Sequence, residues 1–382
     1  MAYDKVVDSA SLDSKLTQVA DAIRTKGNTS AGLQFPSGFI SAIQAIQTGT
    51  ELKIIVSVTS GATVTATKGS KVVSGTSVNG VCTLIVPEAG TWSVKATLGE
   101  ETSNTKSVTL TDSYDVPLAF VLPTLNDNDW AKIKLVSDAG QGANYWSVGD
   151  RKAVTLNGTV GALTLSNFTT YAFIIGFNHN SSLEGTNRIH FQLAKTALSG
   201  GTDVALCDNY YLNTVGPAGG FCMNFNNTNT GGWKDSLMRK VICGAEQGGT
   251  TVSILNVISD DLKSALKSVT KYTDNTGNSS AASAVTATTD YFFLLSEYEV
   301  FGGIIYGNTN EKSKQEQYSY YSAGNSKVKY NHSATSTAVR WWLRSAYAIS
   351  SASFIHVSPD GVLDSAVGSA AYSFGFAPGF CV

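Results

Sequence analysis

The chain has 382 residues, 42% of them hydrophobic and 15% charged, and its formal net charge is -2 at pH 7. This composition excludes a largely disordered protein, and the length suits two or three domains, since one core usually serves about 100–200 residues. The 27 Lys and Arg residues do not exceed the 29 Asp and Glu residues. We therefore expect no nucleic-acid partner, because binding to phosphate backbones needs a basic surface.

The sequence carries no signal for export or for membrane insertion. Its first residues include charges and no long apolar run, and no later run reaches the roughly 18 apolar residues that span a bilayer. We therefore expect synthesis in a cytosol and no membrane insertion. The cysteines match no metal-ligand spacing and are expected to be buried thiols. They are Cys82, Cys207, Cys222, Cys243 and Cys381.

Residues 1–49 are predicted to form a short helical module. Apolar residues recur at helical spacing in residues 11–27, where Ser11 is a possible N-cap and Gly27 a stop, and again in residues 35–49. The apolar positions are Leu12, Leu16, Val19, Ala20, Ile23, Phe39, Ile40, Ile43 and Ile46. Two small helices cannot bury both of their faces alone. We expect this module to attach to further copies of the chain, as a homo-oligomer, or to another protein.

Residues 50–122 are predicted to form a small β-sandwich that acts as a spacer. Apolar and polar residues alternate in runs such as ATVTATKG and TWSVKATLG, and turns rich in Gly, Asn and Ser separate these runs. The run that contains Trp92 resembles a strand of immunoglobulin-like domains. We expect the Trp92 side chain to lie in the core.

Residues 123–382 are predicted to form one α+β domain. Short apolar runs such as YAFIIGFNH and IHFQLA are typical of strands, whereas GGWKDSLMRKVICG and VISDDLKSALKSV are typical of helices. Long polar loops rich in Gly and Asn separate these runs. A domain with so much of its chain in loops is suited to presenting a surface.

Candidate metal ligands are few and scattered. His179, His190, His332 and His356 show none of the paired spacings of metal sites, so we expect neither a metal ion nor a cofactor. A histidine that only satisfies structural hydrogen bonds is the commoner outcome for such positions.

Glu297 and Glu299 are the best candidates for a pair of catalytic carboxylates, since residues two apart on a strand share a face. A solvated strand edge is the simpler explanation of this pair. The sequence contains no nucleophile elbow, phosphate-binding loop or dinucleotide-binding motif. We therefore expect that the chain is not an enzyme.

Six motifs after the predicted sandwich carry a family resemblance. They are ANYWSVGDRKAVTLNG, YAFIIGFNHN, GGWKDSLMR, YFFLLSEYEVFG, RWWLRS and GFAPGFCV. Together they resemble the variable proteins of diversity-generating retroelements, which have a C-type lectin fold and are related to phage tropism determinants and to formylglycine-generating enzymes. The resemblance covers about residues 145–382, with a variable region at about residues 340–382. Residues 1–49 also resemble N-terminal segments of phage tail and baseplate proteins.

The resemblance implies a receptor-binding or adhesin protein that displays a diversified ligand-binding surface. It would belong to the virion, in the phage tail, after synthesis in the bacterial cytoplasm, or to the bacterial cell surface. Its partners would be a host cell-surface protein or glycan and, through residues 1–49, other tail proteins. Calcium-lectin motifs of the EPN or WND type are absent, so calcium-dependent sugar binding is not implied.

In this family the ends of the variable region pack into the scaffold, and the residues between them form the binding face. The resemblance assigns to the scaffold Trp341, Trp342, Leu343, Arg344, Gly375, Pro378 and Phe380. It assigns to the binding face Tyr347, Ala348, Ile349, Ser350, Ser353, His356, Ser358, Asp360, Asp364, Ser365, Tyr372 and Phe374. Phe354, Val357 and Gly361 alternate with these positions and are expected in the scaffold.

The composition of residues 346–382 agrees with such diversification. In these retroelements, mutation of template adenines turns AAC and AAT codons into codons that end in C or T. Such codons cannot encode Lys, Glu, Gln, Trp or Met, and residues 346–382 contain none of these five types. A surface loop built from small residues is the alternative explanation.

Two further functions stay open. The first is an enzyme related to formylglycine-generating oxidases, which act through a pair of cysteines, and Cys222, Cys243 and Cys381 are the candidates. The second is a purely structural tail component, for which the C-terminal domain would be dispensable for adsorption to cells.

Overall fold

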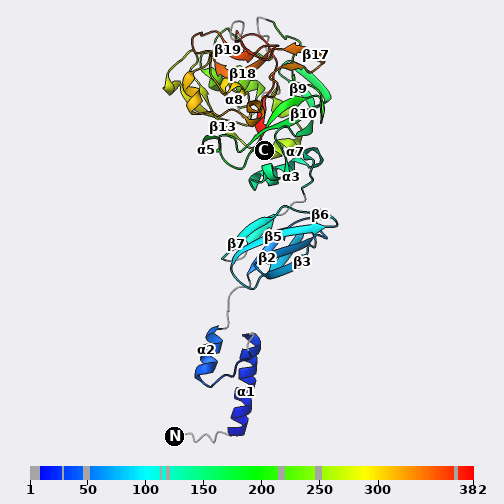
Figure 1. Cartoon of the computed structure of the whole chain (residues 1–382), viewed down its shortest axis with the longest axis vertical. Helices are drawn as coiled ribbons and strands as arrows, with labels where there is room; N and C mark the ends of the chain where they lie inside the picture. The colour runs from blue at the N-terminus through cyan, green and yellow to red at the C-terminus, as the bar shows by residue number, and fades with distance from the viewer. Residues whose placement is uncertain are drawn as a thin grey trace. The chain divides into compact units, whose positions relative to one another are not determined.

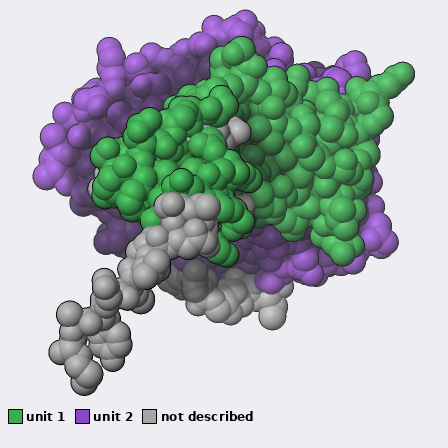
Figure 2. Space-filling view, turned by 90° about the horizontal axis from the view of Figure 1, so that it is seen from below, with its two compact units in different colours: residues 1–118 green, residues 119–382 purple. Residues whose placement is uncertain are grey.

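The structure is a computed structural model (Figure 1), and it describes residues 9–27, 30–45, 52–111, 114–117, 121–213, 220–245, 252–364 and 369–382. The chain divides into two compact units, residues 1–118 and 119–382, which Figure 2 shows in different colours. The boundary predicted after residue 122 lies close to this division. None of the described helices is long and apolar enough to cross a membrane.

The first unit begins with two helices, α1 (Ser9–Lys26) and α2 (Ser37–Ala45). They pack through Ala20 and Ile23 of α1 and Phe39 of α2, all of which are buried. Because α1 begins before Ser11, this residue lies inside the helix, and its prediction as the N-cap is wrong. Ile46, predicted on the apolar face of the second helix, lies outside the described residues.

Two β-sheets follow among the described residues of the first unit. One has the strand order β4-β1-β8, and the other has the order β3-β2-β5-β6, with β7 also paired to β5. The strands are β1 (Lys53–Ser57), β2 (Thr63–Lys68), β3 (Lys71–Thr76), β4 (Val81–Ile85), β5 (Gly90–Leu98), β6 (Glu101–Thr102), β7 (Lys106–Leu110) and β8 (Tyr114–Pro117). In β4 and β5 buried side chains alternate with more exposed ones, the pattern of sheets with one solvated face. The Trp92 side chain in β5 is completely buried.

The largest sheet of the second unit has the order β15-β21-β11-β10-β9. Its strands are β9 (Arg151–Val160), β10 (Leu163–Phe177), β11 (Ile189–Lys195), β15 (Phe292–Phe293) and β21 (Gly379–Cys381). The last strand of the chain, β21, therefore lies between β15 and β11 and pairs with both in antiparallel fashion. Every residue of β11 and β21 is buried, so both faces of the sheet are covered there.

The described residues of this unit also form three smaller sheets, in the orders β12-β16-β17, β13-β14 and β18-β19-β20. Their strands are β12 (Val204–Ala205), β13 (Val269–Asp274), β14 (Val285–Asp290), β16 (Lys329–Asn331), β17 (Ala334–Val339), β18 (Trp341–Ala346), β19 (Phe354–Val357) and β20 (Leu363–Asp364). The helices are α3 (Trp130–Asp138), α4 (Gly142–Tyr145), α5 (Ser181–Glu184), α6 (Gly232–Asp235), α7 (Asp260–Ala265), α8 (Glu297–Phe301) and α9 (Ser319–Ser322). The unit has the mixed α+β composition that the sequence predicts.

Aromatic packing fixes the C-terminal strand in the core. The Phe380 ring lies 5.2 Å from the ring of Phe191 in β11 and 5.2 Å from that of Phe292 in β15, measured between centroids. The indole of Trp130 in α3 meets Phe380 edge to face at 6.0 Å. Strand β21 is thus a central part of the largest sheet.

Candidate ligand-binding surface

Strand β18 anchors one end of the predicted binding segment in the core. All of its residues are buried. The indole Nε1 atoms of Trp341 and Trp342 donate to the carbonyls of Lys327 and Phe221, each at 2.9 Å. Both large side chains therefore bury their apolar rings while their single polar atom is satisfied. Figure 1 shows β18 and β19 at the end of the second unit opposite to α3 and α7.

The two ends of the segment are hydrogen-bonded to each other. The amide of Trp342 donates to the carbonyl of Gly375 (3.1 Å), and the amide of Gly375 donates to the carbonyl of Arg340 (2.8 Å). Only glycine fits at this position, because an added Cβ would lie 2.6 Å from the Cβ of Ala205. The segment between these ends is therefore a closed loop that starts and finishes at one place in the core.

A buried ion pair fixes Arg344 within β18. Its Nη1 and Nη2 atoms both donate to the carboxylate of Glu299, and Nη1 also donates to the carbonyl of Leu294 at 2.8 Å. The ammonium of Lys271 donates to the same carboxylate at 2.9 Å. Burial by itself raises the pKa of Glu299, but Arg344 and Lys271 hold that pKa well below its ordinary value. The carboxylate is therefore charged at neutral pH, and its charge in the core depends on these two cations.

The two glutamates singled out in the sequence lie at the start of helix α8 and not on a strand edge. Both are completely buried, so the prediction of a solvated pair is wrong. Glu299 forms a capping box with Ser296, in which each side chain bonds the other residue's amide. Residues two apart on a helix point in different directions. Glu299 therefore faces Arg344 while Glu297 faces the loop after α8, and they do not form a catalytic pair.

The carboxylate of Glu297 organises the loop that follows α8. Its Oε1 atom accepts hydrogen bonds from the amides of Ile305 (2.6 Å) and Tyr306 (3.1 Å), and its Oε2 atom accepts one from the amide of Gly307 (2.7 Å). The loop backbone is thus bonded inwards to one buried carboxylate. The side chain of Ile305 points outwards and is 71% exposed.

This loop and the predicted binding segment lie side by side. The amide of Ala348 donates to the carbonyl of Tyr306 (3.0 Å), and the rings of Tyr306 and Tyr347 meet edge to face with centroids 5.7 Å apart. Ile349 follows in the chain and is 77% exposed. We call Ile305, Tyr306, Tyr347 and Ile349 the two-loop surface. Exposed apolar side chains gathered on neighbouring loops are typical of binding sites.

Asn229 supports the segment from the interior. The two Nδ2 hydrogens of this completely buried residue are shared among the carbonyls of Tyr347 (3.2 Å), Ser350 (2.7 Å) and Ser353 (2.8 Å). The backbone N–H of Asn229 donates to the carbonyl of Ser351 at 2.7 Å. One asparagine therefore supports the loop through its backbone carbonyls.

The structure separates the predicted binding-face positions into exposed and buried groups. Those that are exposed or half-buried are Tyr347, Ala348, Ile349, Ser350, Ser353, Asp360, Asp364 and Tyr372. Those that are buried are His356, Ser358 and Phe374, and their assignment to the binding face is wrong. Ser365 lies outside the described residues. The positions assigned to the scaffold, from Trp341 to Arg344 and at Gly375, Pro378 and Phe380, are all buried.

Core packing explains the buried group. The rings of His356 and Phe374 lie 5.8 Å and 4.5 Å from the ring of Trp342, measured between centroids. Burial lowers the pKa of His356 to about 4, so the imidazole is neutral at pH 7. Ser358 closes a turn instead, with its amide and its hydroxyl both donating to the carbonyl of Val362 at 2.9 Å.

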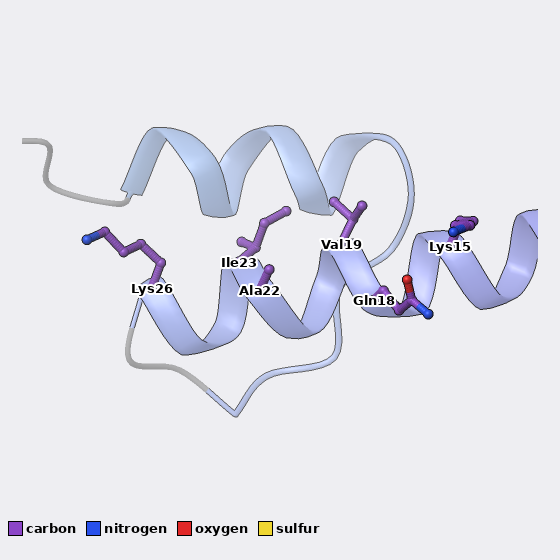
Figure 3. Close-up of a pocket in the computed structure, with 6 residues that line it drawn as sticks. All are labelled: Lys15, Gln18, Val19, Ala22, Ile23 and Lys26. Carbon is purple, nitrogen blue, oxygen red and sulfur yellow. The ribbon is translucent and has the colours of Figure 1, made fainter.

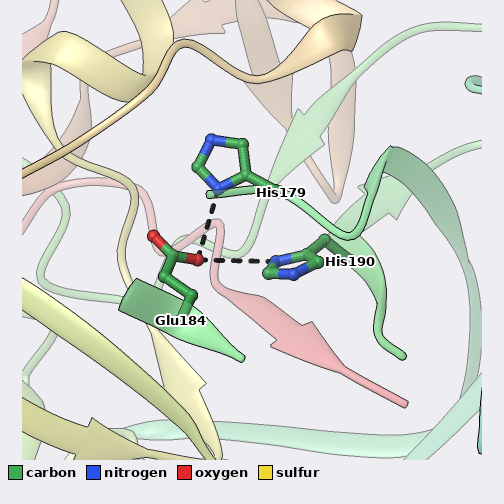
Figure 4. A group of neighbouring side chains, drawn as sticks. All are labelled: His179, Glu184 and His190. Atoms are coloured by element: carbon green, nitrogen blue, oxygen red, sulfur yellow. Dashed lines mark hydrogen bonds and ion pairs between the residues drawn. The ribbon is translucent and has the colours of Figure 1, made fainter. Parts of the chain in front are cut away.

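His179, Glu184 and His190 form a buried cluster with the composition of a metal site (Figure 4), although their sequence spacing gave no sign of it. One carboxylate oxygen of Glu184 lies 3.2 Å from Nδ1 of His179 and 2.7 Å from Nζ of Lys271. Lys271 also donates to the hydroxyl of Tyr318 at 2.8 Å and to Glu299. With Glu184, these acceptors use all three N–H donors of the Lys271 ammonium.

Lys271 therefore already supplies a positive charge where a metal ion would bind. The Nε2 atom of His179 is committed to the carbonyl of Glu316 at 3.0 Å. Burial and the nearby charge of Lys271 lower the pKa of His190 well below its ordinary value, so this ring is neutral. The arrangement suits a buried salt-bridge network, and we assign no metal to it.

The cysteines are free thiols and all are buried. Burial raises the pKa of Cys207, Cys222 and Cys381 to about 12 in each case, and raises that of Cys243 as well. A cysteine that acts as a nucleophile needs an accessible thiol with a lowered pKa. Cys222, Cys243 and Cys381, the candidates for an oxidase-like cysteine pair, are instead buried and have raised pKa values.

Residues 204–382 match a family described as a domain of unknown function (DUF6273). The match begins at β12 and runs through the two-loop surface to the end of the chain, whereas the first unit and β9 to β11 lie outside it. No curated protein matches the chain. The description of this family gives no activity.

Proposed function

We propose that the second unit is a ligand-binding domain with a C-type lectin fold, and that it displays a diversified surface to a host cell-surface protein or glycan. In this proposal the chain is a phage-encoded receptor-binding or adhesin protein of the virion tail or of a bacterial surface. The first unit links the domain to further tail proteins or to other copies of the chain. No catalytic role is assigned to any residue.

One observation carries the proposal, namely the closed loop between β18 and Gly375. Both of its ends are buried and bonded to each other, while Tyr347 to Ser353 is supported from inside through its backbone by Asn229. Backbone support places few demands on side chains, so residues such as Ile349 can be replaced without disturbing the core. A surface whose ligand changes needs binding side chains that can be replaced without loss of the core contacts that maintain the fold.

Binding to intact cells tests the proposal. The labelled full-length chain should bind cells of at least one strain in a panel of Gram-positive and Gram-negative bacteria. Ile349→Asp should reduce that binding by about tenfold or more, because a central apolar contact would be replaced by an unpaired charge. Ala287→Asp, at an exposed position of β14, is the matched control and should leave binding unchanged.

Failure to bind any strain, or equal losses in the two variants, would contradict the proposal. Diversification of the surface is tested separately, by the DNA sequence next to the gene. A near-copy of the 3′ end of the gene that differs at adenines, next to a reverse transcriptase gene, is expected there. Its adenine differences should fall in codons for exposed positions such as Ile349 and Asp360, and not in those for Phe354 to Ser358.

A further inference from the structure

Helix α1 has an open apolar groove that the packing against α2 does not fill. The groove has a volume of about 430 Å³ and is formed by side chains of α1 alone. Figure 3 shows these side chains, which are Lys15, Gln18, Val19, Ala22, Ile23 and Lys26. Val19 lies in the middle of the row and is 47% exposed.

The helix pair buries too little to be stable without a cover. Its buried core consists of Ala20, Ile23 and Phe39, whereas Leu12 and Ile40 remain 45% and 53% exposed. Helical segments of this size need a disulfide, a metal ion or a partner for stability. The described residues of α1 and α2 include no cysteine or histidine for a disulfide or a metal site, which favours a partner.

The charges at the ends of the groove indicate the chemistry of that partner. Lys15 and Lys26 are eleven positions apart in sequence, which corresponds to about 16 Å along a helix. Within the described part of the chain neither lysine has an ion-pair partner, whereas the nearby Asp21 is paired with Arg24. An apolar floor between two lysine ammonium groups fits an apolar stripe between two carboxylates.

A second copy of the same helix fits this groove poorly. In an antiparallel pair centred on Val19, Lys26 of one copy would lie within one turn of Lys15 of the other, because these residues are seven and four positions from the centre. In a parallel pair each lysine would face its own counterpart. Like charges at such distances repel, so self-association through this face is disfavoured.

We propose that the groove of α1 is a docking site for an amphipathic helix of another protein, with an apolar stripe flanked by acidic residues about three turns apart. The apolar side chains of that helix would cover Val19 and Ala22, next to Ile23, which is already buried in the core of the helix pair. Its carboxylates would pair with Lys15 and Lys26. This inference concerns the first unit and holds whatever ligand the second unit binds.

Two synthetic helical peptides test the proposal on the full-length chain by fluorescence anisotropy. Both carry the same apolar stripe, and one has Glu where the other has Lys at two positions eleven residues apart. The Glu peptide should bind about tenfold more tightly, and added salt should reduce the difference. Lys15→Glu should weaken binding of the Glu peptide, whereas Lys95→Glu, at an exposed position of β5, should not.

Equal affinity for the two peptides, or no binding of either, would overturn the proposal without any need for variants. Sedimentation of the chain over a range of concentrations tests whether a second copy of the chain occupies the groove. If the chain forms dimers that Val19→Asp abolishes, the groove is a contact between copies and the proposal is wrong. A chain whose self-association is unaffected by Val19→Asp agrees with it.

Discussion

Replacing Arg344 by Met should lower the free energy of unfolding by about 3–5 kcal/mol, the loss expected when one partner of a buried ion pair is removed. Arg344 is completely buried, and it donates two hydrogen bonds to Glu299, which is itself completely buried. Without the guanidinium, the Glu299 charge would keep only Lys271 as a cationic partner. Urea denaturation followed by fluorescence and by circular dichroism measures the change.

Lys134→Met provides the matched control for this prediction. Lys134 pairs with Asp138 on the surface of α3 at 3.2 Å, and both side chains are substantially exposed. Exposed pairs of this kind stabilise a protein by at most about 1 kcal/mol. If Arg344→Met and Lys134→Met cost the same, the network around Glu299 does not hold β18 in place.

Trp342→Ala should also lower the free energy of unfolding by about 3–5 kcal/mol, since it removes a large buried aromatic side chain. The loss includes the contacts with His356 and Phe374 and leaves the carbonyl of Phe221 without its indole donor. Ile349→Ala should change the free energy of unfolding by no more than about 0.5 kcal/mol, because the side chain is mostly exposed. Urea denaturation of the two variants measures both values.

A large loss for Ile349→Ala would show that the loop is part of the core and not a replaceable surface. Tyr347→Ala should fall between the two variants, at about 1 kcal/mol. Its ring is half-buried and meets Tyr306 edge to face, and such aromatic pairs contribute roughly 0.5–1.5 kcal/mol.

The sequence indicated the ends of the binding segment well because large and conformationally special residues mark them. Trp341 and Trp342 are residues that a fold rarely leaves exposed, and Gly375 occupies a position where the backbone is too close to Ala205 for any other side chain. Such residues report burial or close approach wherever they occur. The resemblance assigned these ends to the scaffold, and their residue types agree with the burial that the structure shows.

The interior of the segment was harder to predict because its strand β19 is short and buried on both faces. Alternation separates two faces only when one of them meets solvent, and all residues of β19 are buried. His356 was assigned to the binding face because it lies between the two ends of the segment, although its imidazole is neutral and lies among aromatic rings. Polarity is a weak guide to exposure for a residue that loses its charge at low cost.

Ile305 and Tyr306 were missed because nothing in their local sequence links them to a segment more than forty positions away. Their place depends on Glu297, whose carboxylate accepts three backbone hydrogen bonds from this loop. The sequence singled out Glu297 as chemically unusual but gave it the wrong role. A glutamate next to a loop rich in glycine is a signal of backbone support that could have been weighed against catalysis.

A stability scan of every position from Arg340 to Val382 would show whether a rigid frame carries a replaceable surface, with the fraction of folded protein measured after proteolysis of displayed single substitutions. Most substitutions at the exposed positions Ile349, Ser351 and Asp360 should leave the folded fraction unchanged. Polar substitutions in β18, in β19 and from Gly375 onwards should abolish folding. A uniform loss of folding across the whole segment would show that no such replaceable surface exists.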